Sequence, residues 1–183
     1  KDITKASIRK RSTSGMSHIP EDRHKHGLVL DYSLEYNMIL QTYFESRFTD
    51  RIGFLRRKNI RQYSDRLIEQ YDVRSGQGSV TPARSMSGGN QQKAIIAREI
   101  DKSGMKLLVF DEPTAVLTES EAKQLLDVMK QIAAKGIAII FITHRLDEVM
   151  DAADTITILR DGMLVTSIPK ETTTPENLAA MMI

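Results

Sequence analysis

The chain has 183 residues, of which 40% are hydrophobic and 27% are charged, and its formal net charge is +2. This composition is typical of one globular domain with a real core, and so small a net charge gives no support for nucleic-acid binding. The chain contains no cysteine, which excludes disulfides and thiolate metal sites, and no apolar run approaches the ~20 residues that span a bilayer, so we expect a cytoplasmic protein.

The first part of the chain contains one predicted strand. Residues 1–15 are rich in Lys, Arg, Ser and Thr, which indicates a solvated terminus. Residues 16–19 are predicted to form a short strand that Pro20 ends. In the charged loop that follows, His24 and His26 flank Lys25, but two histidines without a third ligand do not predict a metal site.

Residues 32–72 are predicted to be helical. Ser33 can cap a helix, and apolar residues recur at helical spacing between residues 60 and 71. Most of the aromatic residues fall in this segment, so we expect them to form the core of a helical subdomain.

A phosphate-binding turn is predicted at residues 87–93. Ser87 is a good N-cap for a helix that runs to Ile100, and Gly88 and Gly89 let backbone N–H groups approach a ligand closely. The free N–H groups and the positive end of the helix dipole favour phosphate.

A short apolar strand, residues 106–110, then brings Asp111 and Glu112 to its carboxyl end. Open α/β sheets bind their ligands at this end of the strands. One carboxylate can hold a metal while its neighbour polarises a water molecule.

The remaining elements follow in order. Thr118 and Glu121 fit a capping box at the start of a helix that Gly136 ends. The Ile-rich run 137–143 is predicted to be a strand buried on both faces of a parallel sheet, with His144 at its carboxyl end. A helix over 145–152, a hairpin over 155–166 and a terminal helix that begins at Thr174-Pro175 complete the chain.

Three of these segments resemble motifs of the ABC-transporter ATPase family. Ser87–Lys93 resembles its signature motif, Leu107–Thr114 its Walker B strand, and Phe141–His144 its switch-histidine strand. The resemblance covers residues 1–183 and implies an α/β fold with a mostly parallel sheet. Within this single domain it implies a helical subdomain over 32–93, while residues 16–31 and 94–183 form the α/β core with a C-terminal hairpin and helix.

The resemblance also implies ATP and Mg²⁺ as cofactors, and roles for individual residues. Asp111 would hold Mg²⁺ through water, Glu112 would act as the general base, and His144 would contact the γ-phosphate. The signature residues would bind the γ-phosphate of ATP held by the opposite cassette: Ser87, Gly88, Gly89 and Gln91. The implied partners are a second ATPase cassette and a membrane permease subunit at the inner face of the cell membrane, without nucleic acid.

The family's phosphate loop, Gly-x-x-x-x-Gly-Lys-Ser/Thr, does not occur in the sequence. We therefore expect the fold to lack the strand and helix around that loop, and ATP hydrolysis by the chain alone to be impaired. Residues up to Lys93 resemble the second cassette of tandem sugar- or nucleoside-importer ATPases, and residues from Lys106 resemble the first.

Without that strand, the strand over 137–143 would have an unpaired edge, so we expect a dimer or larger assembly. Two other functions stay open. The first is a non-catalytic interaction module or truncated fragment that docks on a membrane permease. The second is a soluble ABC ATPase of DNA repair or translation. The last would need a long coiled coil or strongly basic segments, and the sequence contains neither.

Overall fold

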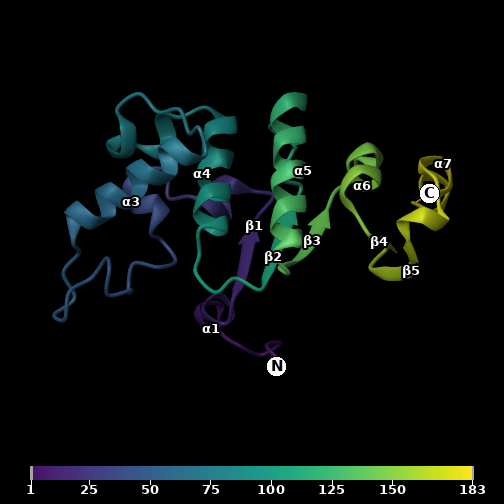
Figure 1. Ribbon diagram of the computed structural model, residues 1–183, viewed down its shortest axis with the longest axis horizontal. Helices are drawn as coiled ribbons and strands as arrows, with labels where there is room; N and C mark the ends of the chain where they lie inside the picture. The colour runs from purple at the N-terminus through teal and green to yellow at the C-terminus, as the bar shows by residue number, and fades with distance from the viewer. Residues whose placement is uncertain (1, 183) are drawn as a thin grey trace.

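The computed structural model describes residues 2–182, so Lys1 and Ile183 lie outside the described residues. Figure 1 shows the helical part, residues 32–72, at one end, a small sheet beneath α4 and α5 in the middle, and a hairpin with α7 at the other end. In chain order the elements are α1 (Ile8–Thr13), β1 (Met16–Ile19), the π-helical turn η1 (Arg23–Gly27), α2 (Leu34–Met38), α3 (Arg57–Gln70), the 3-10 turns η2 (Gly78–Val80) and η3 (Ala83–Ser85), α4 (Gly88–Ile100), β2 (Leu107–Asp111), α5 (Glu119–Ala134), β3 (Ala138–Ile142), α6 (Leu146–Ala152), β4 (Thr155–Arg160), β5 (Met163–Pro169), η4 (Lys170–Thr172) and α7 (Pro175–Met182).

The central sheet has three parallel strands in the order β1-β2-β3, as the resemblance predicts. The register places Ile19, Phe110 and Phe141 side by side across the three strands. On this face, helices α4 and α5 cover the sheet, and Ile95 and Leu126 join Phe110 in one core. The expected α/β fold is therefore confirmed.

The opposite face of β3 is open, which contradicts the prediction that residues 137–143 are buried on both faces. Ile140 and Ile142 are 50% and 47% exposed. Within residues 2–182, β3 pairs only with β2, and its other edge has no neighbouring strand. An apolar run predicts a buried strand, but whether both faces are covered depends on what packs against them.

The helical part contains two helices rather than one continuous helical segment, because residues 39–56 form turns and an isolated bridge between Thr49 and Leu55. Its core includes Phe48 and Tyr63, whose rings meet edge to face. Other aromatics, such as Phe54 at 70% exposure, lie on the surface. The prediction that the aromatics form the core is thus correct for some and wrong for others.

The two ends of the chain fold locally. Residues 8–13 form α1, a short helix capped by Ser7 that the sequence analysis did not predict; it has no buried residue, in agreement with a solvated terminus. The predicted hairpin is present as β4 and β5, and α7 packs on β4 and α6 through the buried Leu178. No helix within residues 2–182 is both long and apolar enough to cross a membrane.

Candidate functional site

The candidate catalytic pair lies where β2 and β3 end side by side. Asp111 closes β2 in register with Ile142, the last residue of β3. Glu112 and His144 follow these two strands, and the Nδ1 atom of His144 lies 2.8 Å from the Oε1 atom of Glu112. The parallel sheet thus brings Asp111, Glu112 and His144 together at its carboxyl edge, as the sequence predicts.

The backbone of Glu112 is in the left-handed region, with a φ of 45°. Its N–H donates to the carbonyl oxygen of Ile142 at 3.0 Å, which ties the turn to the end of β3. Positive φ is costly for a residue with a Cβ atom and is enriched at functional sites. The turn therefore holds Glu112 at the strand end through a strained conformation.

The carboxylate of Glu112 is only half satisfied. Its Oε1 atom is bonded to His144, while its Oε2 atom is buried and has no hydrogen-bond partner among the described residues. A buried carboxylate oxygen without a donor is costly. This oxygen keeps the free lone pairs that a general base uses, and it is closed to solvent in the structure.

His144 differs from Glu112 in its exposure, because 72% of its side chain is open to solvent. The hydrogen bond with Glu112, followed by the charge of that carboxylate, raises the pKa of His144. An imidazole close to its pKa can donate a proton or carry positive charge toward an anionic ligand. The pair therefore combines an acceptor and a donor within one contact.

The signature segment forms the predicted helix N-terminus. Ser87 is the N-cap of α4, and its Oγ atom accepts from the backbone N–H of Asn90 at 3.4 Å. The Nδ2 group of Asn90 also donates to this oxygen at 2.9 Å. Gly88 and Gly89 then form the first turn of the helix and are partly exposed.

Gln91 points inward, which the sequence did not predict. It is 4% exposed; its Oε1 atom lies 3.1 Å from Nε of Arg23 and 2.9 Å from Nε2 of His24, and its amide donates to the carbonyl of Ala83. Gln91 therefore joins the signature helix to η1. Sequence reasoning missed the contacts of Arg23 and His24 with Gln91, because these residues lie 67 or more positions away and leave no local signal.

The next residue links the signature helix to the turn after β2. The amide of Gln92 is buried and donates to the carbonyl of Pro113 at 3.2 Å, and Lys93 pairs with Glu121 at 3.1 Å. No hydrogen bond or ion pair within residues 2–182 joins residues 87–91 directly to Glu112 or His144. The signature helix and the candidate catalytic pair are thus joined by the bond from Gln92 to Pro113, and their polar side chains do not contact each other.

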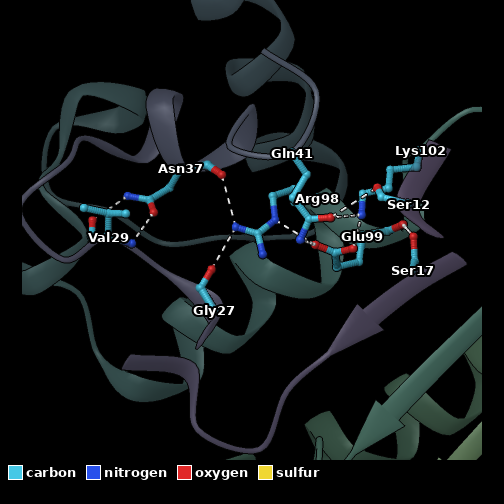
Figure 2. Close-up of polar contacts among 9 residues, drawn as sticks. All are labelled: Ser12, Ser17, Gly27, Val29, Asn37, Gln41, Arg98, Glu99 and Lys102. Carbon is cyan, nitrogen blue, oxygen red and sulfur yellow. Dashed lines mark hydrogen bonds and ion pairs between the residues drawn. The ribbon is translucent and has the colours of Figure 1, made fainter. Parts of the chain in front are cut away.

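A buried polar network fixes the other end of α4 (Figure 2). Nη1 of Arg98 donates to the carbonyls of Gly27 and Asn37, at 2.8 and 3.2 Å. Its Nε donates to Glu99, which also accepts from Gln41 and from Lys102. Burial lowers the pKa of Lys102, and the Glu99 charge opposes this. One helix therefore ties η1, the helical part and the sheet together.

Within residues 2–182, no three His, Asp or Glu side chains are grouped so as to hold a metal ion. Mg²⁺ needs no such cage, since it usually keeps several waters and takes one or two carboxylates together with substrate phosphates. The carboxylate of Asp111, at the end of β2, supplies oxygen donors of the kind this cation prefers. The donor chemistry of the strand end therefore fits a water-coordinated magnesium ion.

No model of a known protein family matches the chain. Among curated proteins it is similar to the nucleoside import ATP-binding protein NupA of Lactococcus lactis subsp. cremoris, with 39% identity over 183 residues that cover 100% of this chain and 36% of NupA. It is also similar to the guanosine import ATP-binding protein NupO of Bacillus subtilis, with 36% identity over 182 residues that cover 100% of this chain and 35% of NupO. The chain thus spans little more than a third of the length of these relatives.

Solved structures show the same fold. The dimeric post-hydrolysis state of the ATP-binding cassette MJ0796, bound to ADP and Pi, matches with a TM-score of 0.71 and 17% identity, over 88% of this chain and 65% of that chain. A bacterial Atm1-family ABC exporter with ATP bound matches with a TM-score of 0.67 and 23% identity, over 92% of this chain and 28% of that chain.

Proposed function

Because this chain belongs to the family of ABC-type ATP-binding proteins, we propose that it supplies part of the ATP-hydrolysing machinery of a nucleoside or sugar importer. The observation that carries the proposal is the 2.8 Å contact between Glu112 and His144 at the carboxyl edge of the parallel sheet. The half-satisfied carboxylate is prepared to accept a proton, and the exposed imidazole is prepared to meet an anion.

Each residue of this edge then has one role. Glu112 would accept a proton from the attacking water, and His144 would donate toward the γ-phosphate while it stays bonded to Glu112. Asp111 would hold the cation through water. Mg-ATP, when bound, supplies the phosphoryl group and the positive charge that neutralises its oxygens.

The signature residues serve a second nucleotide. Ser87, Gly88 and Gly89 present the N-terminus of α4 to the γ-phosphate of ATP held by a second cassette. Gln91 does not face that ligand in our proposal, since its side chain is bonded to Arg23, His24 and Ala83. Its role is to set the position of the helix that carries the glycines.

The remaining partner is a membrane permease, which would dock on the helical part at the inner face of the membrane. Large apolar side chains are exposed there, among them Ile52 at 81% and Phe54 at 70%. Exposed apolar residues grouped on one segment are typical of interaction surfaces. This same observation favours the second candidate function, a module that docks without turning over ATP.

A titration of the 183-residue chain with Mg-ATP, followed by a phosphate-release assay, tests the enzyme proposal. The sequence contains no phosphate loop, so we expect weak binding and hydrolysis at background. Steady turnover on the order of 1 s⁻¹ that disappears in Glu112→Gln would contradict this expectation. Release should rise when a cassette with an intact phosphate loop is added, and docking without any rise would support the interaction module.

The signature is tested in the same mixture. Ser87→Arg should abolish the stimulation, because a long cation replaces the cap and covers the first turn of α4. The matched control is Ser85→Arg, an exposed position two residues earlier, which should keep the stimulation. Stimulation that survives Ser87→Arg would show that the signature contacts no nucleotide.

A further inference from the structure

Glu148, a buried acidic residue of α6, lies just behind the catalytic pair and takes no part in the proposed chemistry. It is 3% exposed. Its Oε2 atom accepts from the Oγ1 atom of Thr114, itself 1% exposed, at 2.9 Å. Its Oε1 atom lies 2.9 Å from Nη1 of Arg145, as an ion pair without hydrogen-bond geometry.

These two partners come from the two turns that carry the site. Thr114 stands two residues after Glu112, and Arg145 directly follows His144. One carboxylate therefore connects the turn after β2 with the turn after β3. A buried charge is stable only when it is paired, so both contacts are costly to break.

His144 has little else to define its position. Its side chain is mostly exposed, so packing does not restrict the ring, and an exposed side chain gains rotamer entropy when it leaves its partner. It precedes α6, a helix of seven residues whose N-cap, Arg145, makes no side-chain capping bond. Leu146, Val149 and Met150 pack α6 against the hairpin and α7, and Glu148 is the buried residue that faces the turn after β2.

We propose that Glu148 and Thr114 are positioning residues that set the contact between His144 and Glu112. Neither touches a reacting group. Their bond holds α6 against the turn after β2, so that the imidazole stays within hydrogen-bond reach of the carboxylate. The contact exists without ATP, so its test does not require the proposed function to hold.

The test uses substitutions that change geometry and keep every charge. Thr114→Val removes the hydroxyl at nearly constant volume, whereas Thr114→Ser retains it. Thr157→Val is the matched control, because that hydroxyl bonds to Ser167 in the remote hairpin. The measured quantity is the pKa of His144, followed by NMR titration without nucleotide. Glu112 raises this pKa, and the nearby charges of Arg145 and Glu148 also influence it.

We expect Thr114→Val to lower the His144 pKa by at least about half of the fall that Glu112→Gln produces, because both weaken the same contact. Thr114→Ser and Thr157→Val should keep the wild-type value. If Thr114→Val does not fold, Glu148→Asp replaces it, since it keeps the charge and shortens the reach by one methylene. A wild-type His144 pKa in Thr114→Val, or in Glu148→Asp where that variant replaces it, would overturn the proposal. A fall of the His144 pKa in Thr114→Ser as large as in Thr114→Val would also overturn it.

Discussion

Glu112 carries two unusual features at the level of single residues: a left-handed backbone and a buried carboxylate oxygen without a hydrogen-bond partner among the described residues. Each costs free energy, and folded proteins retain such features mainly where surrounding contacts enforce them. The contacts here are the bonds to Ile142 and to His144. The residue is therefore held in a conformation that costs stability, and these two contacts enforce it.

The Glu112–His144 contact predicts a pH-dependent contribution to stability. The hydrogen bond raises the pKa of His144 in the folded state. The bond therefore stabilises the fold fully below the unfolded-state pKa of about 6.5, and this stabilisation is lost as the pH rises through the folded-state pKa. The difference in unfolding free energy between wild type and Glu112→Gln should thus be larger at about pH 6 than at about pH 9. Urea denaturation at both pH values measures it.

An exposed carboxylate without such a contact provides the control. Glu171 lies on the surface in η4, and Glu171→Gln should change stability equally at both pH values. If the difference in unfolding free energy between wild type and Glu112→Gln is also the same at both pH values, the His144–Glu112 bond does not contribute to stability in solution.

At the level of elements, α4 is the helix to which the other parts are attached. Its first turn presents the signature, Gln91 and Gln92 bind η1 and the turn after β2, and Arg98 and Glu99 bind the helical part. Gly27 approaches α4 so closely that a Cβ atom there would lie 2.5 Å from the Cδ1 atom of Ile95. One helix therefore contacts η1, the turn after β2 and the helical part.

The helix caps give a quantitative prediction at this level. The capping box of α5 is complete, with Thr118 Oγ1 accepting from the N–H of Glu121 and the Glu121 carboxylate accepting from the N–H of Thr118. Thr118→Ala should therefore lower the free energy of unfolding by about 1 kcal/mol, within the 0.5–2 kcal/mol usual for such caps. Chemical denaturation gives this value directly.

Ser33 is the matched cap without a bond. It occupies the N-cap of α2, but its hydroxyl makes no capping bond and is buried without a partner within residues 2–182. Ser33→Ala should leave stability unchanged or raise it slightly, because it removes an unpaired polar group. If Ser33→Ala lowers the free energy of unfolding as much as Thr118→Ala does, the preference of N-cap positions for Ser and Thr, and not the observed hydrogen bond, determines the loss of stability.

At the level of the whole molecule, β3 is the most exposed part of the sheet. Its outer edge has no partner strand within residues 2–182, and Ile140 and Ile142 lie on its open face. Direct closure of the sheet would pair β3 with β4, yet β4 lies in a separate two-stranded sheet with β5. An uncharged, apolar strand edge of this kind promotes pairing with another chain.

We therefore predict that the 183-residue chain forms a dimer or larger assembly, held partly by strand pairing at β3. Sedimentation velocity at low micromolar concentration measures the assembly, and Ile140→Lys should shift it toward monomer by placing a charge on the open face. The control is Leu164→Lys, an exposed position on β5. A stable, monodisperse wild-type monomer would refute association at this edge.

Local signals in the sequence were sufficient to predict most elements. The Ser87 cap, the Thr118–Glu121 capping box, the Pro at the start of α7 and the hairpin around Gly162 all depend on residues within a few positions of each other. The placement of Glu112 and His144 at the carboxyl ends of their strands was predicted from the sequence, and the structure adds the contact between them.

Only the tertiary structure decided which polar groups are buried and which apolar faces are open. Gln91 and Glu148 look like surface residues in the sequence, but contacts from Arg23, His24 and Thr114 hold them inside. Ile140 looks like core and is half exposed. The physical reason is that periodicity records the preference of a residue, whereas burial depends on segments far along the chain that pack against it.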